Sequence, residues 1–304
     1  MTFKSERAQS TILTLVFLTV LLGMAALVLD VGSWYRAQRS LQATADAAAL
    51  AGAQALPESP GSAASLAQAY VAKNGGGSAT VSFSRKLVPN DVVTVSVHAP
   101  QPGLFSKIFG LSSVNVGAHA AARSATPRQA LHVAPITIGS DNPQLRCGAP
   151  CYGQPTNLIA LPTGNNSGNM TNFQLVDLSS HGGRVSSSLV SGWLRTGYDQ
   201  YLSLGSYSGV ASTTFNSPEF RQAMTDMRGK EIIVLIHPSA GGNEGQAGAQ
   251  YTEVGWAGFV IQQFSGSGAQ GTLTGYFTRV NIQGIATSNP GQLFYGARTI
   301  SLID

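Results

Sequence analysis

The chain has two cysteines, and they lie close together in the sequence. Cys147 and Cys151 are separated by Gly-Ala-Pro, and the sequence has no other cysteine. A lone close pair is typical of a small disulfide loop formed in an oxidising compartment. A zinc site needs about four ligands, and no cluster of histidine or cysteine stands near. The alternative is two reduced, buried thiols. We predict a Cys147–Cys151 disulfide.

General-base chemistry would have to come from a small set of histidines. A hydrolase needs a nucleophile, a base and an orienting group in one place, and no spacing in the sequence indicates such a set. His237 ends a predicted buried strand, where active sites do occur, but a lone histidine there is more often a structural residue. The sequence therefore predicts no catalytic site and no cofactor. The five histidines are His98, His119, His132, His181 and His237.

Two glycine-rich stretches partly resemble functional loops, but each lacks the spacing or the neighbouring helix that the function requires. Gly205–Gly209 has Gly-x-x-x-Gly spacing and not the Gly-x-Ser-x-Gly elbow of hydrolases. Gly266–Gly271 echoes a dinucleotide-binding loop, but it falls between two predicted strands and not before a helix. We interpret the second stretch as a hairpin loop.

Composition narrows the function classes. Charged residues make up 11% of the 304 residues, well below the ~25% usual for soluble domains. The net charge is +4, but the basic residues are scattered and no basic stripe is interleaved with aromatic residues. Nucleic-acid binding is therefore not indicated. The length allows more than one hydrophobic core.

An uncharged apolar segment, Thr11–Leu29, is long enough to cross a bilayer as a helix. The alternatives are a cleaved signal peptide, whose apolar region is usually shorter, and a buried core helix. No small-x-small cleavage site follows the segment directly, so we predict a membrane anchor. Asp30 comes next, either as a proton-binding site within the membrane or as a boundary charge in the headgroup region.

The orientation of the anchor is less directly encoded. Lys4 and Arg7 precede the span and Arg36 and Arg39 follow it, so the positive-inside count is tied. The cysteine pair favours an oxidising compartment for the body of the protein. We therefore expect a cytoplasmic N-terminus, and export of all residues from Asp30 onward.

An alanine-rich stretch without proline continues from the span to Leu56 and predicts a stalk helix. Small residues recur in it every four positions, at a spacing that lets helix backbones approach closely. The seam could lie within the chain or between copies of the chain, and both are open for different faces. The seam residues are Ala45, Ala48, Ala49, Gly52 and Ala53.

Residues after Pro57 predict a small helix-and-sheet unit. Ser62–Lys73 reads as a helix stopped by Asn74-Gly75-Gly76-Gly77. Alternating valines predict strands around 81–83, 93–97 and 114–122, with a helical face at Leu104–Phe109 between the last two. A linker is predicted at 126–130.

Residues 131–304 predict a mostly antiparallel, β-rich domain. One clear helix begins with Ser217 as its N-cap and Pro218 as its first residue, and a shorter helix is indicated around 189–194. The fold class is α+β. The predicted strands are Leu131–Ile138, Phe173–Leu178, Ile232–Ile236, Thr252–Phe264, Leu273–Ile285 and Leu293–Leu302, and the predicted segments are 1–10 (cytoplasmic), 11–29 (transmembrane), 30–56 (stalk), 57–125 (small α+β unit), 126–130 (linker) and 131–304 (β-rich domain).

The stretch from Glu6 to Leu56 resembles the N-terminal segment of the TadE/TadG-like family, which serves assembly of the tight-adherence (Flp) pilus. The resemblance rests on Glu-Arg-x-Gln, an apolar span, Asp-x-Gly, an aromatic residue with Arg, and Leu-Gln-x-x-Ala-Asp-Ala-Ala-Ala-Leu-Ala-Gly-Ala. The matching motif residues are Asp30, Gly32, Arg36, Leu41, Gln42, Ala45, Asp46, Ala49, Leu50 and Gly52.

Two departures from related patterns bear on function. Some TadG-like proteins carry a von Willebrand A domain with an Asp-x-Ser-x-Ser metal site. Here Asp177 and Ser179 fit that pattern, but His181 stands at the second serine position, so no Mg²⁺ site is expected. The chain also lacks the glycine-plus-glutamate cleavage signal of major pilins, which indicates a minor or uncleaved component.

The resemblance implies a non-enzymatic, single-pass component of pilus assembly in the bacterial inner membrane, acting as a scaffold or minor subunit. Its expected partners are the membrane, other pilus-assembly proteins and, through the stalk, a second copy of itself. The alternative is a membrane-tethered envelope enzyme, or a ligand-binding or adhesion protein, that uses the β-rich domain.

Overall fold

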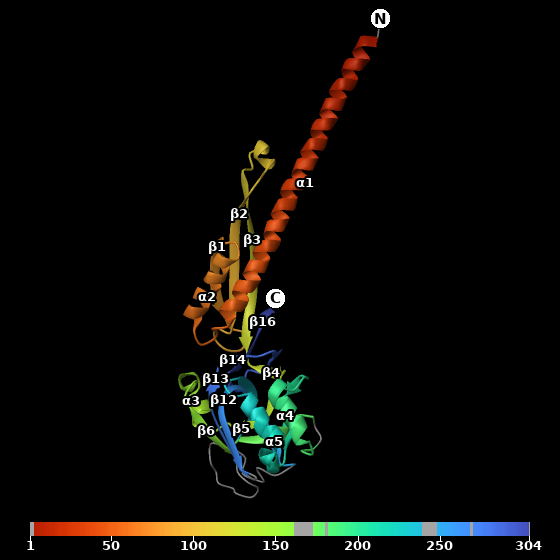
Figure 1. Cartoon of the computed structure of the whole chain (residues 1–304). Helices are drawn as coiled ribbons and strands as arrows, with labels where there is room; N and C mark the ends of the chain where they lie inside the picture. The colour runs from red at the N-terminus through yellow and green to blue at the C-terminus, as the bar shows by residue number, and fades with distance from the viewer. Residues whose placement is uncertain (1–2, 161–172, 180–181, 239–247, 268–269, 304) are drawn as a thin grey trace. The chain divides into compact units, whose positions relative to one another are not determined.

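The protein is described by a computed structural model that covers residues 3–160, 173–179, 182–238, 248–267 and 270–303. The chain divides into two compact units. The first comprises Met1–Arg123 with Ser301–Asp304, and the second comprises Ser124–Ile300. Helices and mostly antiparallel strands occur in both (Figure 1), so the predicted α+β class is confirmed.

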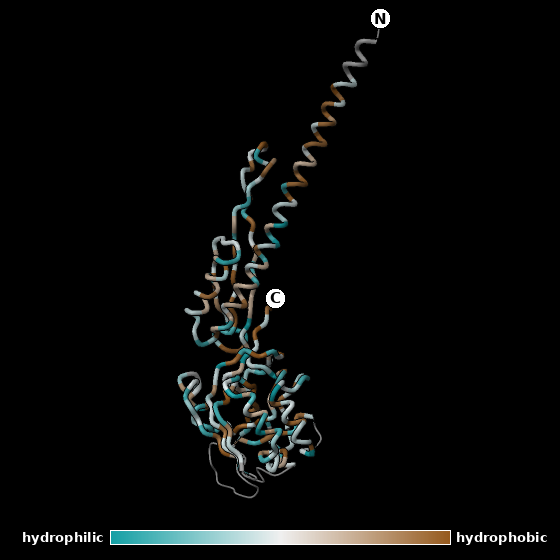
Figure 2. The backbone as a smooth tube through the Cα atoms, viewed as in Figure 1, coloured by the Kyte–Doolittle hydropathy of each residue, from teal (hydrophilic) through white to brown (hydrophobic). Residues whose placement is uncertain are grey.

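The first unit is dominated by one unbroken helix, α1 (Phe3–Ala53, 51 residues). Its N-terminal half carries bare apolar side chains, since every large apolar residue from Ile12 to Leu29 is at least 47% exposed. Figure 2 shows this half as an almost continuous hydrophobic stretch. Among the described residues, α1 is the one helix long and apolar enough to cross a membrane. The single predicted span therefore has the length and composition that crossing requires.

The C-terminal half of α1 is covered by a helix and a small antiparallel sheet. α2 (Pro60–Lys73) lies against α1, and so does β2 (Val92–Pro102). β2 pairs with β1 (Ser78–Ser84) on one side and with β3 (Ser113–Ala125) on the other. Val93, Val95 and Val97 alternate along β2 and are fully buried. The period-two pattern in the sequence thus identified the face of the sheet that meets the helix.

The hairpin formed by β2 and β3 ends in a short 3₁₀ helix, η1 (Ser106–Phe109). A helix over Leu104–Phe109 was predicted here, so the element exists but is shorter and tighter. Gly110 ends it with φ of 84°, a conformation that suits glycine because it has no Cβ. The stalk is also shorter than expected, because α1 ends at Ala53 and turns lead to Pro57.

An eight-stranded sheet forms the centre of the second unit. Its neighbouring strands are antiparallel except for β5 and β10, which run parallel. The predicted strand Thr252–Phe264 is in fact two strands, β11 and β12. In sheet order the strands are β11 (Gln250–Thr252), β9 (Ser206–Gly209), β7 (Phe173–Asp177), β5 (Val133–Gly139), β10 (Glu231–His237), β12 (Gly255–Ser267), β13 (Gln270–Thr278) and β6 (Thr156–Ala160).

Two helices pack together on this sheet, α4 (Ser187–Thr196) against β5 and α5 (Pro218–Asp226) against β12 (Figure 1). The predicted cap of α5 is confirmed, because Ser217 Oγ accepts a hydrogen bond from the Phe220 amide at 3.2 Å. Aromatic rings fill the space beneath α5 in edge-on contacts that add to the burial energy. These rings are Phe173, Phe215, Phe220 and Phe264.

The predicted linker at 126–130 is wrong, because β4 (Pro127–Ala130) is a strand between β15 (Gly284–Ala286) and β8 (Leu202–Ser203). Pro127 is buried and its carbonyl accepts a hydrogen bond from the Trp256 indole at 3.0 Å. Pro127 is the first residue of β4, a position at which a sheet tolerates proline. The second unit accordingly begins at Ser124 and not at residue 131.

The remaining elements are short. Leu273–Ile285 was predicted as one strand, but β13 ends at Thr278 and is followed by β14 (Val280–Asn281) and β15. β14 runs parallel to β16 (Ala297–Ile303). The other short elements are α3 (Pro143–Cys147), η2 (Ala149–Cys151) and η3 (Ser212–Asn216).

A buried ion pair holds the β1–β2 turn to β3. Asp91 is fully buried, and its carboxylate accepts hydrogen bonds from the amides of Lys86 and Leu87 at 2.6 and 3.0 Å and from Arg123 Nε at 3.0 Å. Burial alone would raise the pKa of Asp91, but these donors outweigh it and hold the pKa below its usual value.

We predict that Asp91→Ala lowers the free energy of opening of β2 and β3 by about 3–5 kcal/mol at pH 7, because it leaves the Arg123 charge buried without its partner. The pKa of Asp91 is lower in the folded protein than in the unfolded chain. The stabilisation that the wild-type carboxylate provides is therefore complete above the unfolded-state pKa of about 4, and it is lost as the pH falls through the folded-state pKa. Amide hydrogen exchange of β2 and β3 measures it. Asp226→Ala, which removes an exposed pair with Arg195, is the control and should change local exchange little.

Candidate functional site

Asp30 follows the apolar half of α1 and binds the tip of the β2–β3 hairpin through hydrogen bonds. Its carboxylate accepts hydrogen bonds from three successive backbone amides, those of Leu104 at 2.9 Å, Phe105 at 3.1 Å and Ser106 at 2.6 Å. The residue is 1% exposed. We call this arrangement the Asp30 clamp. It joins residues 74 to 76 positions apart in the sequence.

The chemistry of the clamp is that of a fixed anion. Burial raises the pKa of Asp30, but the amide hydrogen bonds from Ser106, Leu104 and Phe105 more than offset this, and the pKa lies below its usual value. A carboxylate that accepts several amide hydrogen bonds favours its charged form, so this arrangement does not suit a proton carrier. The interpretation as a boundary charge in the headgroup region is incomplete, because the side chain is buried by protein.

The small residues of the stalk form a seam inside the first unit. Ala45, Ala48, Ala49 and Ala53 are fully buried. A Cβ on Gly52 would stand 3.1 Å from the Ala63 carbonyl oxygen and 3.3 Å from the Ala67 Cβ, both on α2. The predicted seam is therefore used within the chain, where short side chains let α1 approach α2 and β2.

Polar residues of the stalk fix it to its neighbours at two points. Gln42 donates hydrogen bonds to Asp46 Oδ1 at 2.8 Å and to the His119 carbonyl of β3 at 2.9 Å. Thr44 Oγ1 donates to the Asn74 carbonyl at the end of α2 at 2.8 Å. These hydrogen bonds join α1 to β3 and to the end of α2.

The other motif residues have varied surroundings. Leu41 is buried and Leu50 is half-buried, so both contribute apolar contacts. Arg36 is exposed. Gly32 is also exposed, and a Cβ there would meet nothing within 4 Å; nothing in the structure explains a glycine at this position.

Cys147 and Cys151 form a disulfide in the second unit, with Cα atoms 5.7 Å apart. It closes the turn between α3 and η2. The loop is so short that it restricts few conformations of the unfolded chain, and a local ordering role fits this better than a large contribution to global stability.

His237, the histidine at the end of β10, belongs to a buried polar cluster. Its Nδ1 lies 2.8 Å from Thr137 Oγ1, and the Thr137 hydroxyl donates to Glu253 Oε2 at 2.9 Å. Burial lowers the pKa of His237 to about 4 and raises that of Glu253 to about 8. Thr137 therefore lies between the imidazole and the carboxyl group, whereas a catalytic triad has the histidine in the middle.

The carboxylate of Asp177 is used in hydrogen bonds to the turn that follows it in the chain. Asp177 Oδ1 accepts hydrogen bonds from the amide and hydroxyl of Ser179 at 2.9 and 2.7 Å, and Oδ2 accepts one from the Gly183 amide at 3.1 Å. His181 lies outside the described residues. Within the parts of the chain that the structure describes, no three His, Cys, Asp or Glu side chains gather in a way that could hold a metal ion.

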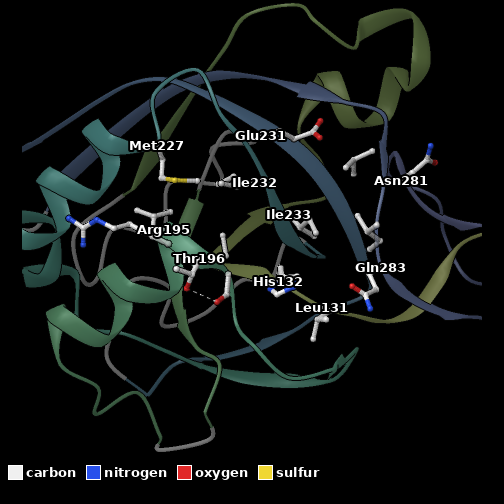
Figure 3. A pocket seen from close by; sticks show the side chains of 15 residues that line it. Leu131, His132, Arg195, Thr196, Met227, Glu231, Ile232, Ile233, Asn281 and Gln283 are labelled. Carbon is white, nitrogen blue, oxygen red and sulfur yellow. Dashed lines mark hydrogen bonds between the residues drawn. The ribbon is translucent and has the colours of Figure 1, made fainter.

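A pocket of about 280 Å³ opens in the second unit beside α4 and β10. Figure 3 shows that Arg195 and Glu231 lie at separate places on its wall and do not face each other. Arg195 pairs with Asp226 at 2.8 Å, and Glu231 accepts a hydrogen bond from Thr278. Both charges thus have partners of their own, and much of the remaining wall is apolar. The arrangement resembles a packing irregularity more than a site with converging polar groups.

Comparison with protein families links the first of these sites to a known group. The family model described as Putative Flp pilus-assembly TadE/G-like matches residues 8–55. This N-terminal segment is TadE/TadG-like. The matched residues, the Tad segment below, run along α1 and include its bare apolar half, Asp30 and the small-residue seam. No curated protein and no solved structure matched the chain.

The sequence identified most residues of the Tad segment but not their partners. The amides that bind Asp30 lie on a loop more than seventy positions away, and backbone donors leave no trace in side-chain patterns. Thr137 and Glu253 were missed for a related reason, since each is a single polar residue in an otherwise ordinary strand or loop.

For the stalk, we predict that Ala49→Leu lowers the free energy of unfolding of the first unit by about 1–3 kcal/mol, because the fully buried site has no room for three more carbon atoms. Gln54→Leu introduces the same side chain at an exposed position just past the helix and should change it by no more than about 0.5 kcal/mol. Thermal unfolding in detergent, read out by stalk and α2 amide exchange, compares the two. Equal stability of both variants would show that the seam is not closely packed.

Proposed function

We propose that this protein is a non-enzymatic, single-pass component of Flp pilus assembly in the bacterial inner membrane, a TadG-like scaffold or minor subunit with residues 30–304 exported. The observation that carries the proposal is that the Tad segment covers nearly all of α1. The family match at 8–55 covers both the bare apolar half and the buried seam of one continuous helix.

Export of the second unit is supported by its disulfide. Cys147 and Cys151 are the only cysteines of the sequence and are bonded to each other. Stable disulfides form in oxidising compartments such as the periplasm and are rare in the cytosol. An N-terminus in the cytoplasm and a body in the periplasm fit this requirement.

A non-enzymatic role is supported by the way the polar groups of the second unit are used. Burial lowers the pKa of His237 to about 4, which favours the neutral imidazole, and the ring packs edge-on against Tyr251. Glu253 is buried beside Thr137, and the charges near the pocket are paired. His237 Nδ1, the Thr137 hydroxyl and Glu253 Oε2 are thus hydrogen-bonded within the fold, as structural polar residues are.

The proposed partners are the membrane and other pilus-assembly proteins. Self-association through the stalk would have to use faces other than the buried alanines, since those already contact α2 and β2. Half-buried and exposed positions of α1 beyond Asp30, such as Leu50 and Ala43, remain available for a second copy.

A surface-fibre assay in cells that lack the native gene tests the proposal. Deletion of Thr11–Leu29, or of the stalk from Leu41 to Leu56, should abolish fibres. His237→Ala and Asp177→Ala should retain them, with at most a stability loss of about 0.5–3 kcal/mol. Immunoblotting of membranes controls for protein level.

Loss of fibres in His237→Ala at normal protein level would contradict the proposal and point to chemistry in the second unit. Full function of residues 30–304 released from the membrane would contradict the anchoring role. The two outcomes concern different parts of the chain and are therefore separable.

A further inference from the structure

We propose that the tip of the β2–β3 hairpin, residues Gly103–Ser112, inserts into the interfacial layer of the same bilayer that α1 spans. The protein would then hold the membrane at two points, a helix through it and a loop in its surface. This inference rests on the proposed membrane span.

The tip exposes apolar side chains that the fold does not use. Leu104, Phe105, Ile108 and Leu111 are 63%, 39%, 80% and 55% exposed. Among the described residues of the first unit outside α1 and the tip, the exposed large apolar side chains are Leu66, Tyr70, Val88 and Leu302, at 38–44%. None of them is as exposed as Leu104, Ile108 or Leu111. A local concentration of exposed apolar side chains indicates a contact surface.

The Asp30 clamp places this surface at the edge of the membrane. Thr11–Leu29 rises by about 28 Å at ~1.5 Å per residue, close to the ~30 Å of the hydrocarbon core. Asp30 therefore stands at the boundary. Its bonds of 2.6–3.1 Å to the amides of Leu104, Phe105 and Ser106 hold the tip at the same level. Figure 1 shows the hairpin reaching alongside α1.

Neighbouring residues have the chemistry of a membrane interface. Trp34 and Tyr35 follow Asp30, and tryptophan and tyrosine are enriched at headgroup level. Trp34 Nε1 donates to the Pro102 carbonyl at 3.4 Å, beside the tip. Lys107 is exposed within the tip, and its long side chain can reach lipid headgroups while its stem stays among apolar groups.

Many backbone amides of the tip are hydrogen-bonded within the protein, which suits an environment that is poor in water. The amides of Leu104, Phe105 and Ser106 bond to Asp30, and those of Gly103, Ile108, Gly110 and Leu111 bond to carbonyls within the tip. Entry of unpaired backbone groups into lipid is costly. The occupant of this surface is therefore the bilayer itself, which continues directly from the bare half of α1.

Nitroxide scanning of the full chain in phosphatidylcholine–phosphatidylglycerol nanodiscs tests the inference. Single cysteines are introduced by Ile108→Cys and Leu111→Cys in the tip, and the native cysteines do not interfere because they are disulfide-bonded. Val88→Cys is the matched control, since Val88 lies in the β1–β2 turn at the other end of β2 and is also exposed. Val20→Cys reports on the span.

The expected result is a ratio of oxygen to nickel-chelate accessibility that is several-fold higher at Ile108 and Leu111 than at Val88, and that approaches the ratio at Val20. A tip ratio equal to that of Val88, with a lipid-like Val20, would overturn the inference and leave the span intact; the tip would then await a protein partner. A water-like ratio at Val20 would instead overturn the membrane span on which the inference rests.

Discussion

The helix α1 has to be stable in two different surroundings along its length, and this constraint explains the rest of the first unit. The apolar half of α1 keeps its side chains bare, as a lipid-facing helix does, while the alanine-rich half lies in a protein core. A core against a helix of small side chains requires close approach of its neighbours, and α2 and β2 supply it. The two halves belong to one unbroken helix, so the apolar half continues directly into the small domain.

Asp30 lies where the exposed apolar half of α1 meets the half that is covered by protein. A single carboxylate there fixes the hairpin tip to the anchor through backbone amides, so it orders the tip without depending on the side chains of the tip. Those side chains are free to be apolar and exposed. The same residue that follows the apolar span therefore also positions the hairpin tip, for which we propose a second membrane contact.

Much of this arrangement could be predicted from the sequence where local patterns carry the information. The alternation of Val93, Val95 and Val97 and the cap at Ser217 identified their elements, and the four-residue spacing of alanines identified the seam. The role of Asp30 could not be predicted, because its partners are backbone groups far along the chain. The strand at Pro127–Ala130 was missed because proline and a short length mask its pairing with β15 and β8.

The coupling between anchor and hairpin is most directly tested by hydrogen–deuterium exchange of the full chain in lipid nanodiscs, comparing wild type with Asp30→Ala. Asp199→Ala, the same substitution at an exposed position of the second unit, is the control. The clamp predicts that the amides of Leu104, Phe105 and Ser106 exchange many-fold faster in Asp30→Ala only, while β1 keeps its protection. Unchanged exchange of these three amides in Asp30→Ala would contradict a role for Asp30 in holding the hairpin to the membrane helix.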